Sequence, residues 1–370
     1  MVIDLPVWEG VKPTRVANKI MPFSLCVSDS GLIIQNTPNN IKNDVIKKYS
    51  DDNYNYITTE PGKSDFNVVG IRNRIKKLKS LAGLLEGLNV IEIGGGNDYM
   101  ANIVLEEEGV ENYMVVDPSI RVESTNKKLT IIREYFDKNL ISSKFDMAIC
   151  ISCLEHVPDA VSFLEDLREV LRDDNSKAIV FFPIVDDQFK NGDINSIVHE
   201  HISYFTKESA VVILESVGFK IESSEFSNDG GWFCLSRSEV KCYNKNSIIG
   251  SQKSLLIQFE NKLTENIKKF SEYLKRNDDF IFFGACNGIN SLLGLNDVHN
   301  KKITIIDSDQ SKSNGYISSV ENPIISKEEY IFDKSKRVVV SSNSFYNQIR
   351  KDLVENFNVD EGDIVSVINI

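Results

Sequence analysis

Apolar and polar positions divide the chain into alternating helix-like and strand-like stretches. Between residues 66 and 85, apolar side chains recur at three- and four-residue steps, the period of a helix with one buried face. Short apolar runs follow, each separated from the next by a helical pattern or a polar segment. They cover Asn89–Ile93, Tyr113–Val116, Leu129–Ile132, Phe145–Ile151 and Ala178–Phe182. This alternation predicts an α/β fold with a parallel sheet covered on both faces.

A second periodic stretch divides the chain into parts. From Leu256 to Leu274 the apolar positions are spaced 3, 4, 4, 3 and 4 apart, which predicts one long amphipathic connecting helix over about residues 251–275. Strand patterns then begin at Phe280 and recur near Arg337–Val340 and Asp363–Ile368. We therefore expect four parts: a small N-terminal lobe (1–64), a larger α/β domain (65–245), a connecting helix (246–278) and a second, smaller α/β domain (279–370).

Composition excludes several classes of protein. The chain of 370 residues has 42 Lys and Arg against 54 Asp and Glu, a net charge of −12, which disfavours nucleic acid as a partner. The apolar runs are far shorter than a membrane-spanning helix needs, and the N-terminus lacks a basic flank followed by an apolar core. Six Cys without a regular framework are typical of free thiols in a reducing compartment. We expect a cytoplasmic protein that acts on a small molecule; the pattern leaves its oligomeric state open.

The first chemical signal is a glycine cluster at the end of a strand. Asn89–Ile93 runs directly into Gly94-Gly95-Gly96, and the next strand ends at Asp117 about twenty residues on. Glycines let the backbone turn tightly and approach a ligand, while a carboxylate at the tip of the next strand can accept both hydroxyls of a ribose. The pattern predicts a site for an adenosine-containing cofactor. An ordinary strand-to-helix turn is the alternative for the glycines taken alone.

Two further features narrow this prediction. Glu92 stands inside the strand, two residues before the first glycine, and a later strand ends in Leu154-Glu155-His156-Val157. With these residues the sequence resembles the class I methyltransferases that use S-adenosylmethionine. The resemblance implies a Rossmann-like fold in which the glycine bend packs on the methionine half of the cofactor, the acid after the second strand holds the ribose, and the loop after the third strand flanks the adenine. Carried over by position, the cofactor-binding residues are Glu92, Gly94, Gly96, Asp117, Glu134, Tyr135 and Phe136. Asp98 stands where many members have a third glycine, and His156 is interpreted as a structural residue.

The second chemical signal is His199-Glu200-His201, which contains two of the four His of the chain and follows the fifth strand. Imidazole can accept a proton near neutral pH, and a neighbouring carboxylate can orient it. A metal site is the weaker alternative, because no further His follows at the spacing of a zinc protease.

The segment His199–Thr206, followed by a helix and Gly218-Phe219, resembles the sugar-nucleotide C-methyltransferases, and Phe282–Gly288 with Ile303–Gly315 is similar to their C-terminal Rossmann-like domain. Leu25–Gln35 resembles the end of their N-terminal zinc lobe. That lobe binds zinc through paired C-x-x-C motifs, and here it has only Cys26, so we expect no metal. Val198 replaces a Tyr that members often place three residues before the last His.

The resemblance implies a base that forms an enolate before methyl transfer. We assign the base to His201, its orientation to Glu200, and polarisation of the substrate carbonyl or shaping of the pocket to His199. The expected substrate contacts are Tyr54, Tyr56, Tyr204 and Lys312, with simple packing as an equal alternative for the first two. The predicted reaction is C-methylation of a nucleotide-linked keto-deoxysugar. The alternatives are O-methylation of a sugar or related metabolite, a non-catalytic binding protein that keeps the fold, and a dehydrogenase, which ranks low because the loop after Phe283 lacks three spaced glycines.

Overall fold

The computed structural model describes residues 1–37, 47, 65–228, 230–241, 243, 245–333 and 336–370. The chain folds into two compact units. The first, here called the C-terminal unit, contains Met1–Cys26, Asp187–His199 and Lys253–Ile370; the second, here called the sheet unit, contains Val27–Asp186 and Glu200–Gln252. The four-part division expected from the sequence stays a prediction. None of the described helices is long and apolar enough to cross a membrane.

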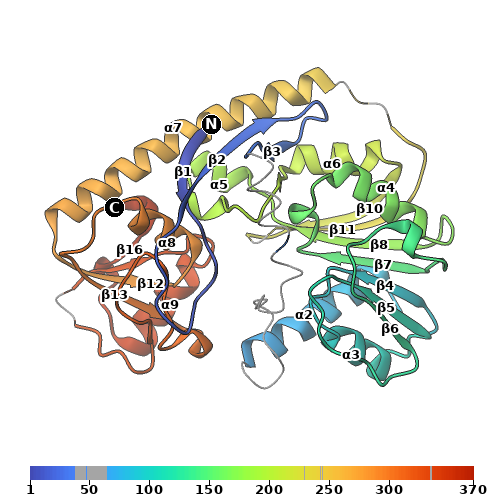
Figure 1. The fold of residues 1–370 in the computed structure, drawn as a ribbon, viewed down its shortest axis with the longest axis horizontal. Coiled ribbons are helices and arrows are strands. Elements are labelled where there is room, and N and C mark those ends of the chain that lie inside the picture. Colours follow the sequence, from blue (N-terminus) through green and yellow to red (C-terminus); the bar gives the residue numbers. More distant parts are fainter. Residues whose placement is uncertain (38–46, 48–64, 229, 242, 244, 334–335) are drawn as a thin grey trace. The chain divides into compact units, whose positions relative to one another are not determined.

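The sheet unit is built on seven strands in the order β10-β11-β8-β7-β4-β5-β6 (Figure 1). The five central and outer strands from β8 to β6 are mutually parallel, whereas β11 pairs antiparallel with both β8 and β10. The strand bounds are β4 (Asn89–Ile93), β5 (Asn112–Val116), β6 (Leu129–Ile132), β7 (Met147–Ile151), β8 (Lys177–Phe182), β10 (Phe219–Phe226) and β11 (Gly231–Arg237). The predicted parallel sheet is confirmed, and its antiparallel edge is an addition.

Each face of this sheet carries its own apolar core. Because alternate residues of a strand point to opposite faces, Ile91 and Ile93 join one core while Val90 joins the other. Helices α4 (Ala160–Val170) and α6 (Lys207–Ser216) cover the first face, and α2 (Asp65–Ala82) and α3 (Tyr99–Glu107) cover the second (Figure 1). The Asp159 side chain caps α4 and a capping box at Thr206 begins α6, so both helices begin at fixed residues.

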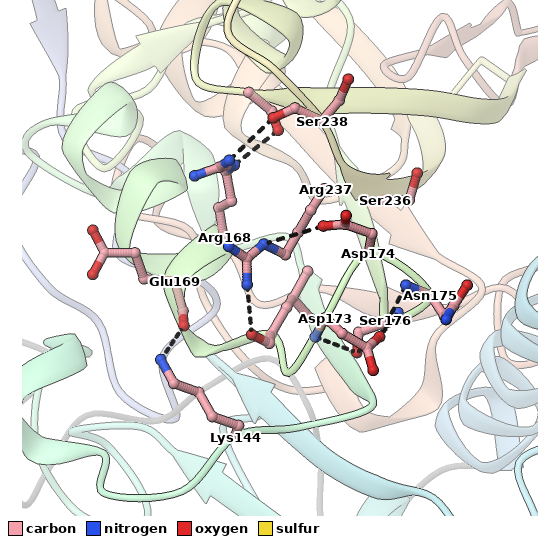
Figure 2. Close-up of polar contacts among 12 residues, drawn as sticks. Lys144, Arg168, Glu169, Asp173, Asp174, Asn175, Ser176, Ser236, Arg237 and Ser238 are labelled. Atoms are coloured by element: carbon pink, nitrogen blue, oxygen red, sulfur yellow. Dashed lines mark hydrogen bonds and ion pairs between the residues drawn. The ribbon is translucent and has the colours of Figure 1, made fainter.

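Polar contacts fix the end of α4 against the antiparallel strands. Arg168 donates to the carbonyls of Gly218 at 2.9 Å and Ser238 at 3.0 Å, and Arg237 donates to the carbonyl of Leu171 at 3.3 Å (Figure 2). These guanidinium groups satisfy carbonyls at the ends of α4, α6 and β11, which have no partner within their own elements. The antiparallel pair is thereby held beside the parallel part of the sheet.

The C-terminal unit has a smaller parallel sheet in the order β14-β13-β12-β15-β16. Its strands are β12 (Asp279–Phe283), β13 (Lys302–Asp307), β14 (Ile325–Ser326), β15 (Val338–Val340) and β16 (Ile364–Ser366). Its helices include α5 (Asp186–Asn191), of which all but the first residue belongs here, α8 (Asn287–Gly294) and α9 (Tyr346–Phe357). One core lies between α9 and alternate residues of β12 and β15. The strands expected from Phe280 onward form a parallel sheet, and their division into a separate domain stays a prediction.

Three details differ from the sequence patterns. Helix α7 (Lys245–Arg276) is longer than the predicted 251–275. The first residues, which showed no clear period, contain β1 (Val2–Pro6), β2 (Ile20–Val27) and β3 (Ile33–Gln35). Val69 and Leu84 were expected on the buried face of the first helix, yet they are 57% and 82% exposed. Leu84 lies beyond the last residue of α2 and therefore no longer follows its period.

Candidate active site

The order in which the chain adds strands to the sheet reverses between β4 and β7, which makes this point a topological switch point. From β4 the chain proceeds outward through β5 and β6, and from β7 it proceeds outward on the other side through β8. Open α/β sheets bind ligands at such a switch point, beyond the carboxyl ends of the strands. The glycine cluster and the Leu154–Val157 segment both lie there, because Gly94–Gly96 follows β4 and Leu154–His156 follows β7. The two segments touch: a Cβ on Gly94 would lie 2.7 Å from the Cys153 sulfur.

The glycine bend is closed by Asp117. Gly94 has φ +77°, a conformation that favours glycine, and the backbone N–H of Gly96 donates to Oδ2 of Asp117 at 2.8 Å. The other oxygen, Oδ1, accepts from the N–H of Ser119 at 2.7 Å and from its hydroxyl at 2.5 Å. A carboxylate has about four acceptor positions, so one remains for a ligand hydroxyl, and Ser119 can release another. Asp98, at the place of a third glycine, has φ −96° and needs no special freedom.

Glu92 lies beneath this bend. Its side chain is 5% exposed, accepts a hydrogen bond from the Tyr113 hydroxyl at 2.9 Å, and approaches within 3.1 Å of where a Cβ on Gly95 would stand. Burial raises the pKa of Glu92 to about 7, and the Tyr113 hydrogen bond opposes that shift. Glu92 therefore supports the bend from below. Tyr113 was not singled out in the sequence, because its position in a strand is equally typical of a core residue.

The three residues expected near the adenine differ in their surroundings. They follow β6, at the same edge of the sheet as Asp117. Glu134 is exposed and Tyr135 is 45% exposed, so both are accessible to a ligand. Phe136 packs its ring edge-on against Phe163 of α4, with 5.3 Å between ring centroids. Their cofactor role stays a prediction.

The residues of the His199-Glu200-His201 motif have separate environments. His199 belongs to the C-terminal unit, where it is 2% exposed and packs edge-on against Phe23 of β2 at 5.4 Å. Glu200 belongs to the sheet unit, and its backbone carbonyl accepts a hydrogen bond from Nδ1 of His156 at 2.9 Å. His201 precedes β9 (Ser203–Tyr204), and its carbonyl accepts from the Gln35 side chain at 2.9 Å.

A cluster of Glu155, His156 and His201 forms just after Cys153, the residue that contacts the glycine bend. One potential ligand atom from each side chain lies within 4.8 Å of the others, and the two imidazole rings meet edge-on with centroids 4.8 Å apart. The backbone N–H of Ile202 donates to the carbonyl of Glu155 at 2.7 Å, which holds the two segments together. Sequence reasoning found His201 but interpreted His156 as structural and gave Glu155 no role. Forty-five residues separate His156 from His201, and only the topology reveals their contact.

Burial determines the protonation of this cluster. It raises the pKa of Glu155 to about 8 and lowers the pKa of His156 to about 4, although the hydrogen bond to the Glu200 carbonyl opposes the latter shift. The pKa of His201 lies well below 6.5, chiefly through burial and further through the neighbouring His156. At pH 7 the carboxyl is protonated and both imidazoles are neutral. His201 can therefore accept a proton without first losing one.

The expected substrate contacts are only partly placed. Tyr204 is 1% exposed and its ring centroid lies 6.0 Å from that of His201. Lys312 belongs to the C-terminal unit, where its ammonium group pairs with Asp307 at 2.9 Å. Tyr54 and Tyr56 lie outside the described residues. Cys26, the one Cys of the N-terminal lobe, is a free thiol.

Comparison with known proteins agrees with this geometry. Residues 70–224 match the family model described as a methyltransferase domain. The chain is 25% identical over 183 residues to the C-methyltransferase NovU of Streptomyces niveus, covering 45% of this chain and 40% of that protein. It is 23% identical over 129 residues to a ubiquinone biosynthesis O-methyltransferase of Histophilus somni, covering 32% and 53%. A methyltransferase structure from Listeria monocytogenes is 10% identical with a TM-score of 0.37, covering 46% and 100%. The chain thus spans about half or less of the curated relatives' length.

The sheet unit therefore has a Rossmann-like fold whose residues 70–224 match a methyltransferase domain, and S-adenosylmethionine is the methyl donor that such a domain implies. The donor set fits the cofactor, since the bend at Gly94–Gly96 and the free acceptor position of Asp117 stand at adjoining strand ends.

Proposed function

We propose that the protein transfers a methyl group to a carbon atom next to the ketone of a nucleotide-linked keto-deoxysugar, with His201 as the base. The observation that carries this proposal is a half-buried, neutral imidazole that contacts His156 of the segment following β7, at the switch point of the sheet. Similarity to a C-methyltransferase supports it. A carbon acceptor must lose a proton before it can be methylated, whereas methyl transfer to oxygen places a weaker demand on a base.

The proton transfer follows from the charges of the cluster. His201 accepts the proton from the carbon beside the ketone, and the electron pair of the broken C–H bond moves into the enolate. The resulting imidazolium lies beside Glu155, and its positive charge lowers the pKa of that carboxyl. A positioned base of this kind contributes about 10²- to 10⁴-fold to the rate. S-adenosylmethionine, when bound, supplies an electrophilic methyl group.

The other residues would bind and position the reactants. Asp117 and the bend at Gly94–Gly96 hold the donor, and Glu134 and Tyr135 flank its adenine. Tyr204 packs beside His201 and limits the directions in which its ring can turn. Glu200 affects His201 only indirectly, because its backbone carbonyl orients the ring of His156, which packs against His201. Tyr54 and Tyr56 are proposed as contacts with the sugar, and His199 as the residue that polarises its carbonyl.

Deuterium exchange tests the proposal directly. The protein is incubated in D2O with a panel of nucleoside-diphosphate keto-deoxysugars, with a metal chelator and S-adenosylhomocysteine but no methyl donor. We expect exchange at the carbon beside the ketone, abolished in His201→Asn and unchanged in His299→Asn, which alters an exposed His. Because the pKa of His201 is low, exchange should not slow as the pH falls from about 7 to about 6, where an ordinary His with a pKa of about 6.5 would become protonated.

The alternative acceptor is a hydroxyl group. Similarity to an O-methyltransferase and Val198 in place of a Tyr favour this second candidate. Methylation without exchange would assign the acceptor to oxygen. Exchange that persists in His201→Asn would overturn the assignment of the base. Binding of S-adenosylmethionine with neither exchange nor methylation on any member of the panel would identify a binding protein that keeps the fold.

A further inference from the structure

Glu155 carries an oxygen that the surrounding protein does not satisfy. The side chain is 3% exposed, and among the described residues its Oε2 atom has no hydrogen-bond partner. Its other oxygen lies 3.8 Å from Nε2 of His156, beyond hydrogen-bonding distance. Buried polar atoms are nearly always paired, and a buried carboxylate costs several kcal/mol unless a proton or a cation neutralises it. A proton neutralises this side chain at pH 7, and a bound cation that displaces the proton would also pair its oxygens.

The neighbouring imidazole is oriented to help hold such a cation. Nδ1 of His156 lies 2.9 Å from the Glu200 carbonyl, which can only accept, so the ring proton is on Nδ1. In the neutral ring Nε2 then has a lone pair, and this atom is the one nearest Glu155. Metal-binding His residues typically donate their second ring N–H to a carbonyl or carboxylate in this way, which fixes the tautomer.

His201 supplies the third ligand atom. Atoms bound tetrahedrally at about 2.1 Å to one ion lie about 3.4 Å apart, so a pair of ligand atoms at the limit of 4.8 Å would have to approach by about 1.4 Å. The two segments of the cluster are already joined by the hydrogen bond from Ile202 to Glu155.

We propose that Glu155, His156 and His201 form a binding site for one first-row divalent transition-metal ion, such as Zn²⁺, bound through one carboxylate oxygen and two imidazole nitrogens. Imidazole ligands select Zn²⁺, Co²⁺, Ni²⁺ or Cu²⁺ over Mg²⁺ and Ca²⁺, which prefer oxygen. The sequence analysis expected no metal, because it considered only the N-terminal cysteines and the spacing around His199 and His201. A regulatory consequence rests on the proposed function: a metal that occupies the His201 lone pair prevents it from acting as a base.

Metal titration tests the site without substrate or methyl donor. Tag-free protein is stripped with a chelator and titrated with ZnCl2 by calorimetry and with CoCl2 by visible absorption. We expect one site, with affinity reduced at least about tenfold in Glu155→Gln and in His201→Asn. His299→Asn should leave the affinity unchanged, and MgCl2 should give no binding heat. Binding of S-adenosylhomocysteine by each variant verifies that the sheet unit is folded.

Several results would overturn the proposal. They are the absence of saturable Zn²⁺ binding, equal affinity in Glu155→Gln and His299→Asn, or a sulfur-to-cobalt charge-transfer band, which would assign the ion to Cys ligands instead. The deuterium exchange assay contains a chelator and no added metal. Failure of the metal site would therefore leave exchange intact, while failure of the proposed function would leave metal binding intact. If both hold, ZnCl2 added without chelator should abolish exchange, and excess chelator should restore it.

Discussion

Replacing Glu92 by Gln should stabilise the sheet unit at alkaline pH and leave its stability near pH 4 unchanged. The pKa of Glu92 is about 7 in the folded protein, against 4.5 for an exposed carboxyl. Between these values the folded state binds more protons than the unfolded state, so stability contributed by this group falls as the pH rises. Each pKa unit corresponds to about 1.4 kcal/mol, and 2.5 units therefore correspond to about 3 kcal/mol lost by pH 8. Gln is uncharged and its carbonyl can still accept from Tyr113.

The measurement is urea unfolding followed by the fluorescence of Trp232. This residue lies in β11 and packs on Phe181, so it reports on the sheet unit. The chain has two Trp, and a Trp8→Phe background removes the one in the C-terminal unit. The difference in unfolding free energy between Glu92→Gln and its parent should rise from near zero at about pH 4 to about 3 kcal/mol at about pH 8.5. Glu155, which also titrates, is present in both proteins and cancels.

A matched variant separates burial from loss of charge. Glu111 is exposed, and its pairing with Lys128 at 3.6 Å is an exposed ion pair, so Glu111→Gln should change stability by less than about 1 kcal/mol at every pH. If the advantage of Glu92→Gln stayed constant from acid to alkaline pH, the buried carboxyl would not carry the pH dependence. The account of Glu92 as a protonated support beneath the glycine bend would then be wrong.

Two further substitutions test the site and the fold. Asp117→Ala should weaken S-adenosylhomocysteine binding about 10- to 100-fold by calorimetry, because a hydrogen bond to a charged group contributes about 1.5 to 3 kcal/mol. The control Ser119→Ala keeps the carboxylate and should change the affinity less than about threefold. Equal effects of the two substitutions would contradict the assignment of Asp117. Gly218→Ala should lower the free energy of unfolding of the sheet unit in urea by about 1 to 3 kcal/mol, since Gly218 has φ +87° and the new Cβ would lie 2.8 Å from Arg168. The control Gly250→Ala in α7 should be neutral or stabilising, because its new Cβ would have no atom within 4 Å. Similar results for both substitutions would refute the strain at residue 218.

The elements that repeat a local pattern could be predicted from the sequence. Asn89–Ile93 and Leu129–Ile132 have the same bounds in the structure as in the apolar pattern, because each is a mostly apolar run that ends where glycine or a charged residue follows. Phe219–Phe226 gave no such signal, since most of β10 is exposed and has charged and polar residues. Its partner β11 is buried, yet its Gly-rich start resembled a loop.

The site was predictable only as far as it depends on adjoining residues. Gly96 and Asp117 could be linked because neighbouring parallel strands end at one edge of a sheet. The association of Glu155 and His156 with His201 depends on how the segment before β9 returns to the end of β7, and no local pattern encodes that path. The protonation states depend on burial, which the sequence does not give. Tyr113 had to be seen beside Glu92 before its hydroxyl had a role.

The same strand-and-bend arrangement occurs in both units, and its surroundings explain why only one is assigned the donor. In the C-terminal unit Asp307 accepts from the N–H groups of Ala285 and Asp309 at 2.8 and 2.9 Å, as Asp117 does from Gly96 and Ser119. Asp307 also pairs with Lys312 at 2.9 Å. At the start of α8, the N–H of Gly288 donates to the side chain of Asn195, also at 2.8 Å. A dinucleotide would have to displace both contacts. The contacts of Lys312 and Asn195 therefore argue against a dehydrogenase and favour the bend before α3 as the donor site.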